Sequence, residues 1–299
     1  MPAPDRPSPP TAGVAAATAA VMAAFAANSV LMRLALDGVA GAPTEVALVE
    51  AATVTLFRLY AGALALAVLL ALRGVRVRVE RPDYGAGALL FVYAAAFSVA
   101  YLDLATGTGA LILFAAVQLT MIGAGLRAGE RLGAAQWAGL AAAVAGVVVL
   151  VAPGVEAPAP LPAATMAVSG VAWGLYSLRG RGAEHPVVTT TVSFLTACVL
   201  GLGLGLATLA VDLPHDAYLH SAEVGYAVAS GALTSALGYV AWYAVLPRLR
   251  ATSASVVQLS VPVLAAVGGV IWLAEPVTLR LAAASVLTLG GIAAVLRAR

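Results

Sequence analysis

The sequence carries very little charge for its length. Only 10% of its 299 residues are Asp, Glu, Lys or Arg, whereas 62% belong to the hydrophobic set. Soluble domains are roughly 25% charged, and a soluble protein of this size would expose more surface than 16 basic and 14 acidic residues could cover. The composition therefore excludes a soluble protein and predicts an all-α integral membrane protein.

Several residue types are scarce. Lysine is absent, so all 16 basic residues are Arg, and Asn28 is the one asparagine. With abundant Ala, Gly and Pro, this usage points to a GC-rich coding sequence and a bacterial source. The one cysteine, Cys198, lies in an apolar run and excludes an internal disulfide or thiolate metal cluster. The net charge is only +2 and the Arg residues are scattered, so no nucleic-acid partner is expected.

Ten hydrophobic segments follow a polar, Pro-rich tail. Residues 1–12 are too short and too interrupted by Pro to fold, which predicts a disordered cytoplasmic tail. Because a membrane span needs about 20 apolar residues, we expect helices at 13–36, 47–72, 84–102, 106–126, 134–151, 161–178, 187–211, 222–246, 252–273 and 277–296. The first could also be a secretory signal cleaved near Phe25, which would leave nine helices; its apolar run continues to Leu36 and favours a retained span.

The distribution of Arg predicts the orientation. With the amino terminus inside, 13 of the 16 Arg residues fall in cytoplasmic segments, where positive charge accumulates. The outside segments hold Arg33 and Arg280, and Arg58 lies within a span. We therefore predict a multi-pass protein of the inner membrane with both termini cytoplasmic.

The chain repeats itself in opposite senses. Residues 129–132 and the following helix with Gly146 are echoed 145 residues later by residues 274–277 and a helix with Gly291. Five spans per half is an odd number, so the second half enters the membrane inverted. This predicts two inverted five-helix repeats, 13–151 and 161–296, a construction typical of secondary transporters with a site at the midplane.

A family resemblance agrees with this architecture. Residues 238–278 contain a GY pair, an aromatic-rich helix, a small-residue loop, a Pro-Val helix and a closing Glu, and this run resembles EamA-type members of the drug/metabolite transporter superfamily. Segments 56–66, 128–150 and 171–182 are similar to other parts of the family pattern. Two departures are that Val117-Gln118 stands where the first half should have Pro, and that Ala274 replaces the Gly before Glu275.

The resemblance implies ten helices in two inverted halves that move a small organic solute by alternating access. Members carry amino acids, nucleobases, sugars or drugs, often as exporters, and the resemblance does not select among them. No cofactor is implied. The expected partners are the solute and the lipid bilayer, and a homodimer is left open.

Polar and aromatic side chains inside the spans are the candidate site. An intramembrane ionisable group is costly and reads as functional, so Arg58 needs a partner: Glu50, Asp103 or helix-terminal carbonyls for a structural role, or the solute itself. Tyr93, Phe97 and Tyr101 share one helix face, while Tyr101 and Tyr243 near helix ends also suit an interfacial belt. Drawn from mid-helix positions of both halves, the predicted substrate-binding residues are Asn28, Gln118, Trp173, Tyr176, Tyr239 and Gln258.

Two other function classes compete with a solute carrier. An intramembrane enzyme would need a nucleophile with a base, or metal ligands, within the spans. The sequence has no HExxH, GxSxG or P-loop motif, and its three histidines fall in loops. We therefore expect no catalytic or metal site. A lipid flippase subunit stays open, because it can share the same helical inventory.

Overall fold

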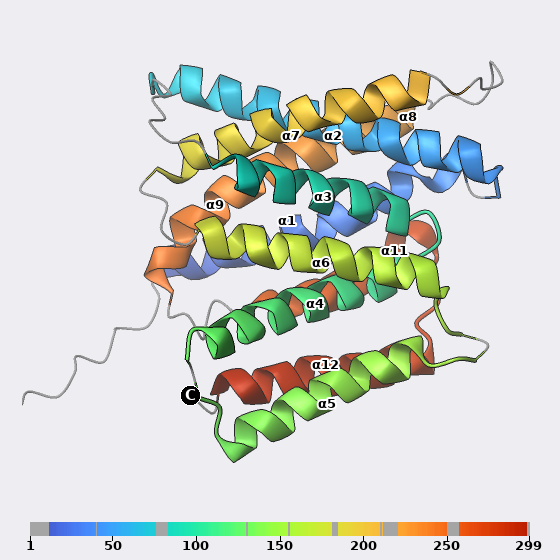
Figure 1. The fold of residues 1–299 in the computed structure, drawn as a ribbon, viewed down its shortest axis with the longest axis vertical. Helices are drawn as coiled ribbons and strands as arrows, with labels where there is room; N and C mark the ends of the chain where they lie inside the picture. The colour runs from blue at the N-terminus through green and yellow to red at the C-terminus, as the bar shows by residue number, and fades with distance from the viewer. Residues whose placement is uncertain are drawn as a thin grey trace, which may run out of the picture.

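The computed structural model describes residues 12–39, 41–75, 83–129, 131–154, 156–180, 185–209, 211, 221–249 and 257–297. Within these ranges the chain is helical and contains no β-strand (Figure 1). The helices are α1 (Ala12–Ala35), α2 (Thr44–Leu72), α3 (Tyr84–Ala100), α4 (Thr106–Arg127), α5 (Ala134–Val151), α6 (Pro160–Gly180), α7 (Pro186–Leu209), α8 (Ser221–Ala229), η2 (Ser230–Leu237), α9 (Gly238–Val245), α11 (Ser260–Leu273) and α12 (Leu279–Arg297), with the short turns η1 (Asp37–Val39) and η3 (Leu246–Arg248).

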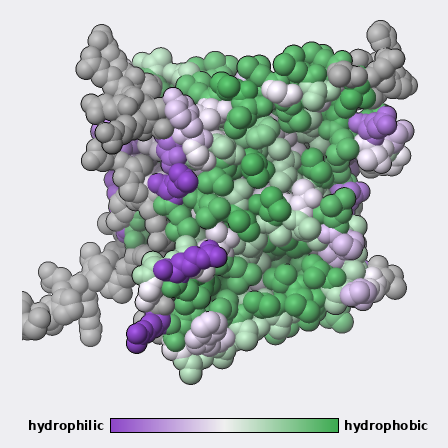
Figure 2. Space-filling model, in the orientation of Figure 1, coloured by the Kyte–Doolittle hydropathy of each residue, from purple (hydrophilic) through white to green (hydrophobic). Residues whose placement is uncertain are grey.

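The surface of the bundle fits a lipid environment. Among the described residues, eight helices are long and apolar enough to cross a membrane, counting Ser221–Val245 as one, and α3 and α11 are shorter apolar helices. Large side chains such as Leu64, Leu209 and Leu279 are 66%, 82% and 83% exposed. Figure 2 shows a broad apolar face with hydrophilic residues gathered toward the two ends. Together these features confirm an all-helical membrane protein.

Most predicted boundaries agree with the structure within a few residues. Two segments differ. The predicted helix 252–273 appears as α11 from Ser260, and residues 252–256 lie outside the described residues. The predicted helix 222–246 is one rod whose middle, η2, is a π-helix rather than an α-helix.

The helix contacts follow a regular pattern. The first-half helices α1 to α5 correspond in order to α6, α7, the rod α8–η2–α9, α11 and α12. Helix α3 packs on α6 as the rod packs on α1, and α4 packs on α6 as α11 packs on α1. Helix α2 contacts the rod as its counterpart α7 contacts α3. Two corresponding pairs also pack directly on each other, α2 on α7 and α5 on α12. Exchanging the two halves therefore leaves these main contacts unchanged.

The α5–α12 pair is a close seam at one edge of the bundle (Figure 1). A Cβ on Gly291 would lie 2.5 Å from the backbone oxygen of Gly139 and from the backbone nitrogen of Ala143. In the same way, a Cβ on Gly146 would lie 2.6 Å from the backbone nitrogen of Thr288. Positions 146 and 291, and positions 143 and 288, are each 145 residues apart, so these two contacts are related by the same spacing along the chain.

Close approach also explains the π-helix. Gly231 lies directly against the backbone of Arg58 in α2, where any side chain would collide with the carbonyl oxygen. The hydroxyl of Thr234 donates to the carbonyl oxygen of Ser230 over 2.8 Å, a local bond that competes with regular helix bonding. In a π-helix, residues five apart share a face. Ser230 and Ser235 therefore both face the centre of the bundle.

The seam yields a direct test with two neighbouring glycines. Gly291→Ala adds a methyl group against the backbone of α5, and we expect it to lower stability by about 1–3 kcal/mol, the usual cost of overpacking. Gly290→Ala meets nothing within 4 Å, so it should be neutral or slightly stabilising. Thermal unfolding of the two purified variants in one detergent checks this. Equal melting temperatures would contradict the seam.

Candidate functional site

Arg58 lies at the centre of the bundle with its side chain 1% exposed. Its Nε and Nη2 donate to the hydroxyl of Ser235 over 3.2 Å, and Nη2 also donates to the hydroxyl of Tyr93 over 2.9 Å. The guanidinium carbon lies 5.0 Å from the ring centre of Tyr93 and 4.8 Å from that of Phe97. Neutral hydroxyls and aromatic faces thus stabilise the cation, and the expected pairing with Glu50, Asp103 or helix-terminal carbonyls is wrong.

Asn28 of α1 joins the same network from the other side. Its Nδ2 donates to the hydroxyl of Tyr93 over 3.2 Å. Its Oδ1 accepts from the hydroxyls of Ser230 over 2.7 Å and Thr234 over 3.0 Å. Asn28, Arg58 and Tyr93 belong to the first half and the hydroxyls of η2 to the second, so polar groups of the two halves satisfy one another.

Aromatic rings wall this network. Trp173 lies 4.5 Å from Tyr239 and 5.0 Å from Tyr93 between ring centres, and Phe25 packs edge-on against Trp173 at 6.2 Å. A small cavity of about 20 Å³ lies between them, room for about one water molecule. Its lining residues are Phe25, Asn28, Ser29, Tyr93, Phe97, Leu113, Phe114, Trp173 and Tyr239. The centre is therefore closed around a space too small for an organic solute.

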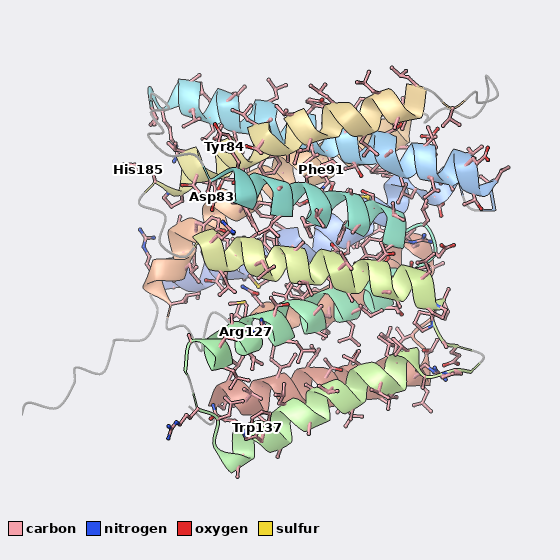
Figure 3. The ribbon with its side chains drawn as sticks, in the orientation of Figure 1. Asp83, Tyr84, Phe91, Arg127, Trp137 and His185 are labelled. Atoms are coloured by element: carbon pink, nitrogen blue, oxygen red, sulfur yellow. The ribbon has the colours of Figure 1, made fainter. Side chains whose placement is uncertain are left out.

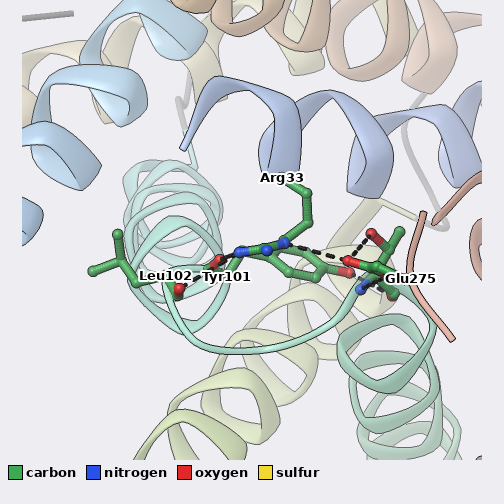
Figure 4. A network of polar contacts seen from close by, with 5 residues as sticks. Arg33, Tyr101, Leu102 and Glu275 are labelled. Atoms are coloured by element: carbon green, nitrogen blue, oxygen red, sulfur yellow. Dashed lines mark hydrogen bonds and ion pairs between the residues drawn. The ribbon is translucent and has the colours of Figure 1, made fainter. Parts of the chain in front are cut away.

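An ion-pair network joins the halves at one end of the bundle (Figure 4). Glu275 accepts from the backbone nitrogen of Thr106 over 2.8 Å and from its hydroxyl over 3.0 Å, and its Oε1 lies 3.5 Å from Arg33 Nε. Arg33 also donates to the carbonyl oxygens of Tyr101 over 2.7 Å and Leu102 over 3.4 Å. Tyr101 is fully buried, so its side chain packs inside the bundle at the end of α3. We call this network the Glu275 latch.

The turn that presents Glu275 is strained. Ala274 ends α11 with φ +52°, the left-handed region that favours glycine. This explains why the family pattern has Gly at this position. The turn is held by a bond from the backbone nitrogen of Glu275 to the carbonyl oxygen of Gly269. A cavity of about 290 Å³ lies beside it, lined in part by Asp103, Glu156 and Glu275.

A second ion pair joins the halves at the opposite end. Asp83 accepts from Arg179 Nη1 over 3.0 Å and, as the N-cap of α3, from the backbone nitrogen of Ala86 over 3.0 Å. Figure 3 places Asp83 at the same end of the bundle as Arg127 and His185. Partial burial pushes the pKa of the Asp83 carboxyl upward, but the Ala86 bond and Arg179 outweigh it and hold the pKa below its usual value. The pair therefore stays ionised at neutral pH.

The structure brings together some predicted site residues and separates others. Asn28, Trp173 and Tyr239 line the central cavity beside Arg58. Tyr176 is buried but does not line the cavity; its ring centre lies 5.4 Å from that of Trp173. Two further predicted residues also lie outside the lining, Gln118 buried in α4 and Gln258 half-buried before α11.

Sequence reasoning missed several residues of the site. Phe25, Ser29, Leu113 and Phe114 line the cavity, and Ser230 and Thr234 bond to Asn28. Tyr93 and Phe97 were recognised as one helix face, but not as the contacts of Arg58. The clustered hydroxyls in SGALTSAL, in the middle of an apolar span, are the signal that could have identified η2.

The site's chemistry suits binding of an organic molecule. It offers hydroxyls, one amide, one guanidinium and aromatic faces. Among the described residues, no three His, Cys, Asp or Glu side chains gather closely enough to hold a metal ion. In this closed arrangement the described residues around the cavity present no paired acid and base.

Comparisons with known proteins agree with the fold. Residues 161–297 match the family model of the EamA-like transporter family. An uncharacterized protein of Pseudomonas aeruginosa, PA1977, is 45% identical over 282 residues, 94% of each chain.

A solved structure, described only as "Crystal structure of protein", aligns with a TM-score of 0.62 over 93% of this chain and 98% of that one, at 24% identity. At this identity the likeness supports the fold alone. With the family match and the helical membrane fold, these comparisons lead to one conclusion. The chain belongs to the EamA-like transporter family of the drug/metabolite transporter superfamily and is a multi-pass membrane transporter.

Proposed function

We propose that the protein moves a small organic solute across the bacterial inner membrane by alternating access between two inverted five-helix halves. The observation that carries this is the pairing of polar groups from both halves around an aromatic-walled space that is closed to solutes. Separating the halves would release Asn28, Arg58 and the η2 hydroxyls from one another. The same groups would then be available to a solute.

Two further features support the proposal. The main helix contacts are unchanged when the halves are exchanged, as inverted repeats require. Ion pairs between the halves occur at both ends, Arg33 with Glu275 and Arg179 with Asp83. Opening one end requires breaking one pair while the other can stay formed, which is the order of events in alternating access.

The orientation and direction of transport are parts of the same proposal. The Arg distribution favours both termini in the cytoplasm and the Glu275 latch outside. The family resemblance favours export. An intramembrane enzyme is disfavoured because family members are transporters, and a flippase subunit is the alternative. The predicted homodimer stays a prediction. Gln118, Tyr176 and Gln258 stay predicted solute contacts that become available only in an opened state.

Transport by the purified protein in proteoliposomes tests the proposal, with amino acids, nucleobases and cationic drugs as solutes. The hydroxyl of Tyr239 is buried and makes no hydrogen bond of normal geometry with the described residues, although it lies near Arg58. Tyr239→Phe should therefore keep normal abundance while raising the apparent KM about two- to tenfold, because it removes one bond to the solute.

The matched control is Tyr60→Phe. Tyr60 is 40% exposed, and its hydroxyl bonds to the carbonyl oxygen of Cys198, away from the cavity. It should leave KM unchanged. An unchanged KM in Tyr239→Phe would remove Tyr239 from the solute site, and no solute flux above empty liposomes for the whole panel would contradict the carrier itself.

The Glu275 latch predicts a shift in gating. Glu275→Gln removes the carboxylate that holds Arg33 and Thr106, and loss of bonds to a charged group costs the closed state about 1.5–3 kcal/mol. A cysteine at Ser29, buried beside the cavity, should then react at least about fivefold faster with a membrane-impermeant maleimide added outside intact cells. Cys198→Ala removes the background thiol.

Glu156→Gln is the control for this experiment. Glu156 lines the same neighbouring cavity as Glu275 but is exposed and outside the latch. It should leave the labelling rate unchanged. If Glu275→Gln also labels at the parent rate, the latch does not gate the outer side.

A further inference from the structure

Arg58 is a buried positive charge without a counter-ion among the described residues. The two ion pairs found in that part of the chain join Arg33 to Glu275 and Arg179 to Asp83, toward the ends of the bundle. Arg58 contacts hydroxyls and rings, none of which carries a full negative charge at neutral pH. A lone Arg in mid-membrane is costly even when its hydrogen bonds are partly satisfied. The positive charge of Arg58 is therefore not balanced by a negative charge among the described residues.

The guanidinium has one unused edge. Of its five N–H donors, the one on Nε and those on Nη2 point toward Ser235 and Tyr93. Nη1 is buried and makes no hydrogen bond of normal geometry with the described residues, and the hydroxyl of Tyr239, which also makes none, lies close to the guanidinium. A buried donor without an acceptor is rare in native proteins and needs an explanation. An anion at Nη1 would supply both the missing charge and the missing acceptor.

The surroundings of this edge favour an anion with an organic body. Tyr93 and Phe97, the rings against the guanidinium, also line the central cavity. The rings of Tyr93 and Phe97 therefore lie between Arg58 and the cavity, whose lining also includes Trp173 and Tyr239. Its bond to Ser235 crosses between the halves, so separation of the halves uncovers it. A solute entering there meets aromatic faces and one guanidinium together.

We propose that Arg58 is the counter-ion of the transported solute, and that this solute is an organic monocarboxylate with an apolar or aromatic body. The inference rests on the proposed transport function. An N–H group of Nη1 can donate to one carboxylate oxygen, and the single positive charge of the guanidinium matches the single charge of a monocarboxylate. A phosphate would require several cationic donors, and among the described residues the other Arg side chains lie toward helix ends. Simple carboxylic acids and amino acids share this carboxylate.

Matched acid and amide ligands test the charge requirement. Binding of phenylacetate and phenylacetamide, and of phenylalanine and phenylalaninamide, is measured by titration calorimetry on the purified full chain in lipid nanodiscs. We expect each acid to bind about tenfold to a hundredfold more tightly than its amide, as loss of a charged hydrogen bond requires. If phenylacetate and phenylalanine bind with equal affinity, the protein recognises the carboxylate alone. Tighter binding of phenylalanine than of phenylacetate indicates a further contact to its ammonium group.

Variants locate the preference. In Arg58→Gln the acid-to-amide ratio should fall to about one, and in Arg58→Lys, which keeps the charge without the planar fork, it should fall only partly. If Arg58→Gln is not monodisperse, the Arg58→Lys ratio decides, and an unchanged ratio overturns the proposal. Arg179→Gln, at the inner end, should keep the wild-type ratio.

The proposal is overturned if no acid binds, if acids and amides bind wild-type protein equally, or if the preference survives in Arg58→Gln. The labelling of Ser29→Cys needs no solute, so gating is tested separately. If Glu275→Gln speeds the labelling of Ser29→Cys but acids are not preferred over amides, this inference is wrong and the proposed transport function is unaffected. If the labelling does not respond either, the latch is not the outer gate, and solute flux in proteoliposomes alone decides the transport function.

Discussion

The centre of this protein depends on keeping one guanidinium charged where hydrocarbon cannot solvate it. Arg58 meets this requirement with bonds to Tyr93 and Ser235 and with the faces of two rings. Its neighbours are constrained in turn. Gly231 must have no side chain so that η2 can lie against α2, and the π-helix directs Ser230 and Ser235 to the same side. The burial of this charge thus coincides with a close backbone contact between α2 and η2.

The interface between the halves combines tight packing with exchangeable polar bonds. At the α5–α12 seam, backbones touch through Gly139, Gly146 and Gly291, and such contacts leave little freedom to slide. At the centre, by contrast, Asn28 bonds to hydroxyls of the other half. Hydroxyl and amide bonds can be replaced by bonds to a solute or water at small net cost. The fold thus separates a firm contact between the halves from one that can be exchanged.

The spans could be predicted from sequence because hydropathy and Arg position reflect the solvent directly. Helix α5, expected at 134–151, begins at Ala134 and ends at Val151. The contacts of Arg58 could not be predicted in this way. Helical periodicity places Tyr93 and Phe97 on one face but does not say which helix that face meets, and Ser235 is 177 residues away along the chain. The π-helix was missed for a related reason, since it depends on packing of Gly231 against α2. Gln118 and Gln258 are polar residues within predicted spans, but this position alone does not say which helix face lines the cavity.

A fixed positive charge at the centre bears on how the membrane voltage acts on the cycle. Arg58 stays with the protein while a bound carboxylate travels, so a solute with net charge −1 carries that charge across the whole field. The cytoplasm is negative, and moving one elementary charge through 100 mV is worth about 2.3 kcal/mol. Outward movement of such an anion is downhill in this field, whereas a zwitterion crosses without electrical work. For an anionic solute, the voltage alone would bias the protein toward export without a coupled ion.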